Sequence, residues 1–288
     1  MIANARMYSV SPVVAELWRT LLAAVIAQAG VSATLIEHAA PAPLEELWSR
    51  TDQGAVFMCG LPFSRAQPQP RLVAAPVPSP AEFGGKAQYW SDLVVRNDSP
   101  FGSVDETFGK RIAFTVPDSQ SGYAAALSYF MSAKRGAPAS AGTPQPLYGE
   151  VIAPAITPLG ALRAVTDGAA DIAPIDSYAF RLLQAYRPDL TSQVRILART
   201  APTPIPPLVA SPSAIVASPA DLDALQSAFL NAHRSAATRR TLGALLLERF
   251  VRPDASAYAV LRERFAAATR YWTEHSLAAV VHPAFAHA

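Results

Sequence analysis

The sequence predicts an α/β protein built of two lobes, and two observations carry this prediction. The chain has 288 residues, of which 51% are hydrophobic and 16% charged, so it can bury a large core. Its length suits two lobes of about 100 to 150 residues each. Strand and helix patterns alternate from the N-terminus, and a β-α-β-α-β order predicts mostly parallel sheets flanked by helices.

The first quarter of the chain establishes this alternation. Residues 5–10 are the first predicted strand, and Ser11 and Pro12 then supply a helix N-cap and a first helical residue. This helix runs to residue 29, and Trp18 lies on its apolar face, which makes Trp18 a core residue. The other elements predicted in this region are strands at 31–37, 55–58 and 71–77 and a short helix at 43–50.

The remainder of the chain continues the pattern. Predicted strands lie at 91–95, 111–116, 151–156, 171–175 and 194–198, and predicted helices at 123–131, 159–167, 178–186, 219–233, 239–250 and 257–272. Ser103 and Glu106 have the spacing of a capping box, and Gly109 marks the end of a short helix. Residues 134–146 are rich in Gly, Pro, Ser and Ala, which predicts a loop.

A turn of small polar residues lies between the strand at 111–116 and the helix that follows it. The first N–H groups of a helix have no partner within the helix and carry partial positive charge, so they attract an oxyanion. Ser119 and Ser121 add hydroxyl donors, and Gly122 allows a ligand to approach the backbone closely. The alternative is an ordinary N-cap, in which a serine only satisfies the helix's own N–H groups.

The same region resembles a known family. The segments YWSDLVVRNDS, GKRIAF and SQSGY, in this order, are similar to the periplasmic substrate-binding proteins of phosphate/phosphonate-type ABC transporters. Met7-Tyr8, CGLPF at 59–63 and AVTDGAADIAPIDSY at 164–178 fall in the family's order and spacing. The resemblance implies a type II periplasmic-binding-protein fold, in which two crossover strands join the lobes and the ligand is clamped in the cleft. It places lobe 1 at 1–93 and 199–288 and lobe 2 at 94–198.

The resemblance also implies the ligand-binding residues. Some of these residues are expected to hold the anionic head of the ligand at the helix start, some to line the cleft, and some to contribute from the second lobe. They are Ser119, Gln120, Ser121, Gly122, Tyr8, Cys59, Tyr89, Trp90, Asp176 and Ser177. Strand register decides whether Tyr89 or Trp90 faces the ligand. Cys59 could instead be a small buried hydrophobic residue, and Asp176 an ordinary helix N-cap.

One segment departs from the family's pattern. Where many relatives carry a histidine, this chain has Ile156-Thr157-Pro158-Leu159-Gly160. A donor to a phosphate-type ligand is lost, so a less charged or larger ligand becomes plausible.

Composition limits other functions. The single cysteine rules out an intramolecular disulfide and a multi-thiolate metal site, and the five histidines lie outside the motif regions, so we expect no cofactor, metal or catalytic residue. The net charge of +2, without a cluster of Lys or Arg, argues against a nucleic-acid partner. Residues 21–29 are apolar but short and follow no basic segment, so we expect no membrane insertion and no signal peptide.

The leading functional hypothesis is a solute-binding protein, not an enzyme, that captures a small phosphonate- or phosphate-like oxyanion for an ABC importer. The resemblance implies a permease and an ATPase as partners, a periplasmic location and a monomer that closes by hinge motion. A cytoplasmic enzyme on the same scaffold, of the menaquinone- or thiamine-precursor-biosynthesis type, is the alternative, and an orphan ligand sensor is another. The missing signal sequence leaves a cytoplasmic location open.

Overall fold

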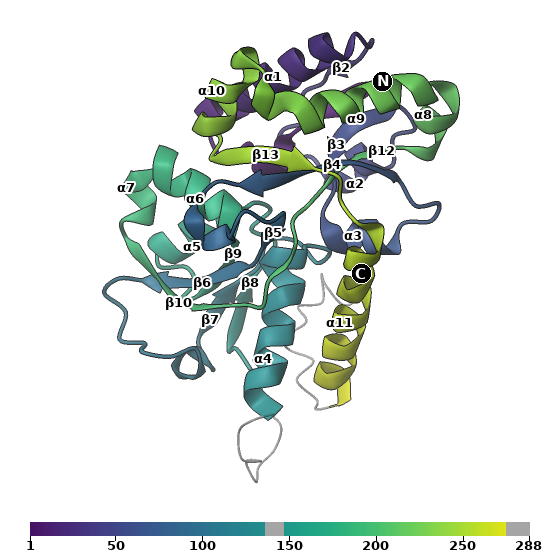
Figure 1. The fold of residues 1–288 in the computed structure, drawn as a ribbon. Coiled ribbons are helices and arrows are strands. Elements are labelled where there is room, and N and C mark those ends of the chain that lie inside the picture. Colours follow the sequence, from purple (N-terminus) through teal and green to yellow (C-terminus); the bar gives the residue numbers. More distant parts are fainter. Residues whose placement is uncertain (136–146, 275–288) are drawn as a thin grey trace. The chain divides into compact units, whose positions relative to one another are not determined.

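The computed structural model describes residues 1–135 and 147–274, which form two compact units. Unit 1 consists of Met1–Tyr89 and Thr203–Ala259, and unit 2 of the described residues within Trp90–Pro202 and Val260–Glu274. Each unit contains helices and strands, so the two-lobed α/β fold is confirmed (Figure 1). The predicted boundaries, 93/94 and 198/199, each lie four residues from this division.

Unit 1 is built around a six-stranded sheet in the order β13-β4-β12-β3-β1-β2. Its strands are β1 (Ile2–Asn4), β2 (Thr34–Leu35), β3 (Gln53–Phe57), β4 (Arg71–Pro78), β12 (Leu208–Ala210) and β13 (Leu247–Val251). Only β1, β2 and β3 pair in parallel, while β12 and β13 pair antiparallel to their neighbours. The sheet is therefore mixed and not mostly parallel as predicted, because these two strands belong to the returning chain.

Helices lie on both faces of this sheet (Figure 1). Those of unit 1 are α1 (Pro12–Ala29), α2 (Leu44–Trp48), α3 (Gly60–Arg65), α8 (Pro212–Ala217), α9 (Pro219–Asn231) and α10 (Ala236–Ala244), with short 3-10 turns η1 (Arg6–Tyr8), η2 (Ala81–Phe83) and η5 (Ala232–Arg234). Helix α1 packs against α9 and α10. Helix α2 buries Leu47 against Ile2 and Val56 of the sheet. A two-stranded ribbon, β5 (Gln88–Tyr89) with β11 (Thr203–Pro204), completes the unit.

Helix α1 begins and ends where its sequence predicts. The Ser11 hydroxyl accepts a hydrogen bond from Val14 N, Pro12 is the first helical residue, and Gly30 ends the helix in the left-handed conformation. By length and composition α1 could cross a membrane, and it is the one described helix that passes this test. Trp18 and Leu21 are buried within unit 1, as in the core helix of a globular domain.

Unit 2 contains a three-stranded antiparallel sheet, β10-β6-β9, and a parallel pair, β7 and β8. Its strands are β6 (Ser91–Arg96), β7 (Arg111–Ala113), β8 (Glu150–Ile152), β9 (Ala173–Asp176) and β10 (Val194–Arg199), and its helices are η3 (Asp105–Thr107), η4 (Gln120–Ala124), α4 (Ala125–Arg135), α5 (Pro158–Thr166), α6 (Ser177–Tyr186) and α7 (Pro188–Thr191). A parallel bridge between Ile112 and Ile172 aligns β7 with the start of β9. The predicted loop at 134–146 lies largely outside the described residues.

Two predicted elements are wrong. The first strand is β1, ahead of the predicted 5–10, because Asn4 Oδ1 accepts a hydrogen bond from Arg6 N and bends the chain into η1. The predicted helix at 239–250 ends in α10 at Ala244. Leu246 then adopts φ +54°, and β13 pairs antiparallel with β4.

The capping-box prediction is correct in that the Glu106 carboxylate accepts a backbone N–H, and wrong about which residue donates that N–H. Glu106 Oε2 accepts a hydrogen bond from the N–H of Gly102, at 2.7 Å, and not from that of Ser103. Gly109 has φ +78°, as expected of a glycine that ends a helical turn.

The last helix, α11 (Ala255–Glu274), belongs to both units. In unit 1, Tyr258 donates its hydroxyl to Ile205 O at 2.8 Å. In unit 2, Trp272 Nε1 donates to Leu127 O at 3.1 Å, and the ring of Phe265 contacts that of Tyr123. The prediction that residues 199–288 return to the first lobe therefore fails for Val260–Glu274, since helical periodicity does not identify the partner of each face.

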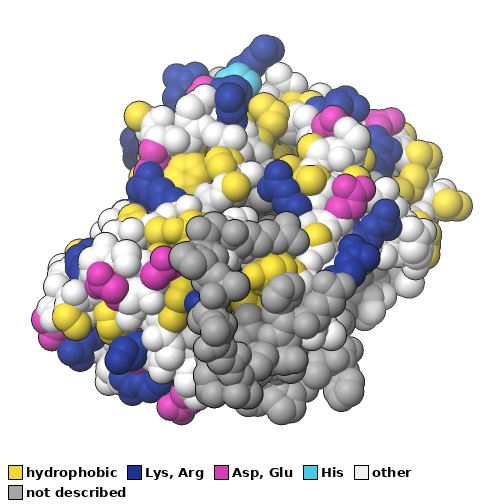
Figure 2. Space-filling model, turned by 90° about the horizontal axis from the view of Figure 1, so that it is seen from below, with side chains coloured by type: hydrophobic (Ala, Val, Ile, Leu, Met, Phe, Trp, Pro, Cys, Tyr) yellow, Lys and Arg dark blue, Asp and Glu magenta, His cyan; other side chains and the backbone are white. Residues whose placement is uncertain are grey.

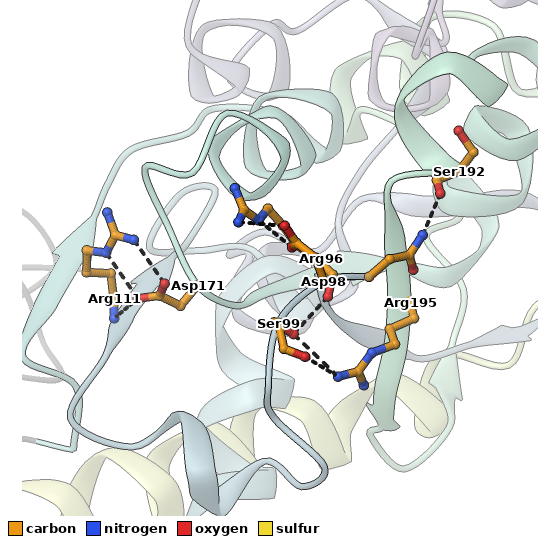
Figure 3. Close-up of polar contacts among 8 residues, drawn as sticks. Arg96, Asp98, Ser99, Arg111, Asp171, Ser192 and Arg195 are labelled. Carbon is orange, nitrogen blue, oxygen red and sulfur yellow. Dashed lines mark hydrogen bonds and ion pairs between the residues drawn. The ribbon is translucent and has the colours of Figure 1, made fainter.

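Polar contacts hold the end of unit 2 where β7 begins (Figure 3). Arg111 binds Asp171 with two nitrogens, Nε at 3.0 Å and Nη2 at 2.9 Å, and its Nη1 donates to Gly168 O. Nearby, Arg96 forms a two-bond pair with Asp98, and Arg195 donates to the backbone of Ser99. The first contact joins the starts of β7 and β9, and Arg195 joins the start of β10 to the segment that follows β6.

The Arg111–Asp171 pair predicts part of the pH dependence of stability. Hydrogen bonds from Arg111 hold the pKa of the Asp171 carboxyl below its usual value. Because the folded pKa is lower than the unfolded one, this contribution is complete above the unfolded pKa and is lost as the pH falls through the folded pKa. Replacing Asp171 with Asn should lower the free energy of unfolding at pH 7 by about 1 kcal/mol.

The measurement is urea unfolding of the wild type and Asp171→Asn at a series of pH values from 7 to 2. The difference in free energy of unfolding between the two proteins should shrink progressively below about pH 4. A gap that stays constant down to pH 2 would show that ionisation of Asp171 does not stabilise the fold.

Candidate anion-binding site

Three helices of unit 2 begin at one edge of its parallel strands. The chain passes from β7 into η4 and α4, from β8 into α5, and from β9 into α6. Each helix start is capped by a side chain: Ser119 accepts from Gly122 N at 2.9 Å, Thr157 from Gly160 N at 3.0 Å, and Asp176 from Ala179 N at 2.9 Å. Because helix N-termini carry partial positive charge, this edge favours an anion.

The start of η4 and α4 leaves donors available. Its first turn is a wide π turn, closed by a hydrogen bond from Ala124 N to Ser119 O. Ser121 is held in place because its carbonyl accepts from the hydroxyl of Ser91, at 2.7 Å. Within the described part of the chain, the N–H and hydroxyl of Ser121 donate to no acceptor. These two donors can bind an oxyanion. Gln120, the first residue of the turn, is buried.

Gly122 is required in this turn by its neighbour Thr115. A Cβ atom at position 122 would lie 1.9 Å from Thr115 Oγ1 and 2.9 Å from Thr115 Cβ. Thr115 N–H donates to Gly122 O at 3.3 Å, and the Thr115 hydroxyl, although buried, has no hydrogen-bond partner among the described residues. The turn therefore packs directly onto Thr115, the second residue after β7.

Ser177 and Trp90 are joined in unit 2, next to the same edge. Trp90 N–H donates to Ser177 Oγ at 3.1 Å, and Ser177 N–H donates to Trp90 O at 2.9 Å. Ser177 is fully buried, so its hydroxyl fixes the backbone where β6 begins. Asp176, which pairs with Ser91 across the sheet, caps α6 with Oδ1, as the alternative interpretation of the sequence expected.

A buried carboxylate lies just beyond Trp90. Asp92 is completely buried, and its oxygens lie 3.1 Å from Arg181 Nη1 and 3.2 Å from Arg199 Nε. The indole N–H of Trp90 donates to Asp92 Oδ1 at 2.9 Å, and the Arg199 guanidinium lies 5.4 Å from the Trp90 ring centroid. The cluster orients Trp90, whose indole N–H is hydrogen-bonded within the protein.

The remaining predicted site residues belong to unit 1. Tyr8 is buried against Trp18 and Phe57, with ring centroids 6.4 Å and 5.1 Å away. Cys59 is buried at the start of α3, and Tyr89 is buried in β5. The structure does not place these residues relative to the Ser119–Gly122 turn, so their role as ligand-binding residues stays a prediction.

The tyrosine after Gly122 is neutral at physiological pH. Burial raises the pKa of Tyr123 to about 12, and its ring packs edge-on against Phe114 at 5.0 Å. It therefore adds no negative charge beside the helix start. On the face drawn in Figure 2, Lys and Arg side chains are dispersed among Asp and Glu and do not form one basic patch. Within 1–135 and 147–274, no group of three or more His, Cys, Asp or Glu could hold a metal ion.

Sequence reasoning did not identify Thr115 or the Asp92 cluster, and it noted Ile156 only as part of the segment 156–160 that lacks a histidine. A charged residue within the apolar run at 91–95 was the available signal for Asp92, since buried carboxylates are nearly always paired. For Thr115 and Ile156 no local signal exists, because a tertiary contact defines the first and an unusual backbone angle the second.

Residues 9–258 match the family described as "ABC transporter, phosphonate, periplasmic substrate-binding protein". The chain belongs to this family. Its members are transport binding proteins, which agrees with the expectation that the chain is a substrate-binding protein and not an enzyme. A search of curated protein sequences found no significant match.

Solved structures support the fold. A binding-protein component of an ABC phosphonate transporter from Pseudomonas aeruginosa is 16% identical, with a TM-score of 0.76 over 97% of this chain and 94% of that one. PhnD1 from Prochlorococcus marinus, in complex with methylphosphonate, is 14% identical, with a TM-score of 0.72 over 93% and 97%. A Xanthomonas citri protein bound to a chloride ion is 18% identical, with a TM-score of 0.63 over 95% and 98%. At these identities the likeness shows a shared type II binding-protein fold.

Proposed function

We propose that the protein captures a small phosphonate- or phosphate-like oxyanion at the Ser119–Gly122 turn and delivers it to an ABC importer. The observation that carries the proposal is the pair of donors on Ser121, N–H and hydroxyl, at the start of a helix. The solved structure of PhnD1 with methylphosphonate supports this class of ligand. The enzyme alternative needs a general base, and the carboxylate that the sequence offered for this role, Asp176, caps α6 with Oδ1.

Membership of the family supports a proposal for the partners and the location. A substrate-binding protein of this family works with a membrane permease and an ATPase, and we propose the same for this chain, in the periplasm. We expect the protein to be a monomer. Size-exclusion chromatography with light scattering tests the last expectation, and a dimer would contradict it.

A thermal-shift panel tests the ligand class. The panel contains phosphate, phosphite, alkyl- and aminoethylphosphonates, sulfate, sulfonates and aromatic carboxylates. A ligand at 100 times its dissociation constant adds about 2.7 kcal/mol to the free energy of unfolding, a shift of several degrees in Tm. One phosphorus oxyanion should stabilise the wild type, and Ser121→Ala should lose most of that shift because it removes a hydroxyl donor.

Ser132→Ala is the matched control. Ser132 lies on the same helix and is exposed, and its hydroxyl donates to Ser128 O of its own helix. Its substitution should leave the ligand-induced shift unchanged. If no oxyanion shifts the wild type but an aromatic carboxylate does, the importer hypothesis fails and the enzyme or sensor alternative replaces it.

A further inference from the structure

Ile156 has a backbone conformation that its side chain disfavours. Its φ is +64°, and among the described residues other than glycine only Leu246 shares a positive φ. A β-branched residue is an outlier in this region, and such strain costs about 1–3 kcal/mol. Glycine or asparagine would adopt the same angle at lower cost. Strain of this kind is found where the surrounding structure imposes it, frequently at ligand sites.

The strained residue lies beside the candidate anion-binding site. Ile156 N–H donates to Thr115 O at 3.2 Å, and Thr115 is the residue that packs against Gly122. The next residue, Thr157, caps α5 at the edge where η4 and α4 also begin. Backbone contacts within unit 2 therefore connect Ile156 to the turn that carries the Ser121 donors.

The side chain at this position is aliphatic and half-buried. It can neither donate nor accept a hydrogen bond, whereas Thr157, the next residue, and Thr115, whose carbonyl accepts from Ile156 N–H, both carry hydroxyl groups. What isoleucine supplies here is apolar surface, and apolar surface favours an apolar part of a ligand over water or a charge.

We propose that Ile156 determines specificity: it contacts the substituent of the oxyanion bound at the Ser119–Gly122 turn and selects an apolar substituent over a charged one or none. This inference rests on the proposed function. It predicts that n-propylphosphonate binds more tightly than its isosteric analogue 2-aminoethylphosphonate, in which an ammonium group replaces the terminal methyl. Each additional CH₂ that Ile156 covers should tighten binding about fourfold.

The test is isothermal titration calorimetry with phosphate, methylphosphonate, n-propylphosphonate and 2-aminoethylphosphonate at one pH. The wild type should prefer the propyl compound to the aminoethyl compound by at least about tenfold. The variants Ile156→Asn and Ile156→Gly suit the backbone angle. In both, the affinities for the propyl and aminoethyl compounds should differ by no more than about threefold, while the affinity for phosphate stays nearly constant. Leu246→Gly relieves the same kind of strain in unit 1 and should leave the ratio at its wild-type value.

The outcomes are distinguishable. If the wild type binds oxyanions but prefers the aminoethyl compound, or if both Ile156 variants keep the wild-type ratio, the specificity inference is wrong and the proposed function stands. If the wild type binds no oxyanion, the proposed function fails and the inference fails with it. Circular dichroism of each variant confirms that lost selectivity is not lost folding.

Discussion

Replacing Asp92 with alanine should lower the free energy of unfolding of unit 2 by about 3–5 kcal/mol. The wild-type carboxylate is completely buried between Arg181 and Arg199 and accepts the indole N–H of Trp90. Without it, the guanidinium of Arg181, whose side chain is only 10% exposed, would be left in a dry environment without its carboxylate. The free-energy cost of leaving a buried charge unpaired is larger than the net stabilisation that the ion pair provides. The reason is that the buried guanidinium keeps its desolvation cost after the attraction of the carboxylate is lost.

Asp98→Ala provides the matched control for Asp92→Ala. Asp98 also pairs with an arginine of unit 2, Arg96, but its side chain is 70% exposed. Exposed ion pairs contribute about 0–1 kcal/mol, so this variant should unfold close to the wild type. The measurement is urea unfolding followed by tryptophan fluorescence, which also reports the environment of Trp90. Equal midpoints for the two variants would contradict the structural role of the Asp92 cluster.

Gly122→Ala should both destabilise unit 2 and weaken ligand binding. The added Cβ would overlap Thr115 Oγ1, at 1.9 Å, so either the turn or the end of β7 must shift. Overpacking of this kind costs about 1–3 kcal/mol. Because the Ser121 N–H and hydroxyl lie one residue before Gly122, a shift of the turn misplaces both donors. We expect oxyanion affinity to fall at least about tenfold by calorimetry.

A second substitution tests the cause of this effect. Thr115→Ala removes Oγ1 and Cγ2 and leaves only Cβ, 2.9 Å from the added methyl group, so the double variant should recover most of the lost stability and affinity. Gly243→Ala is the control, since a Cβ there meets nothing within 4 Å. It should be neutral or slightly stabilising. A double variant as weak as Gly122→Ala alone would rule out the clash with Thr115 as the cause.

Local signals were sufficient for much of the fold. Helix α1 is bounded by Ser11, Pro12 and Gly30, residues that act on the backbone next to them, so its limits follow from the sequence. The strand predicted at 91–95 is β6, and the small polar turn before the helix at 123–131 is the Ser119–Gly122 turn. The N-cap role of Ser119 is equally local, since its hydroxyl accepts from an N–H three residues on.

Two elements whose partners are distant in sequence were predicted poorly. Residues 247–251 have a pattern compatible with a helix, yet they form β13 because the edge of β4 offers them a partner. The two ends of α11 share one periodicity and contact different units. Local propensity amounts to tenths of a kcal/mol per residue, which burial and strand pairing outweigh.

The sequence by itself therefore determined the α/β class, most helix limits and the turn that forms the candidate anion-binding site. Tertiary structure decided which hydrogen-bond donors near the turn can bind a ligand and which are bonded within the protein. Ser177 and Trp90 lie 87 residues apart and hydrogen-bond to each other, whereas the N–H and hydroxyl of Ser121 donate to no acceptor among the described residues. Thr115 excludes every side chain but hydrogen at position 122. These outcomes depend on distances between segments far apart along the chain, which no local pattern of residues encodes.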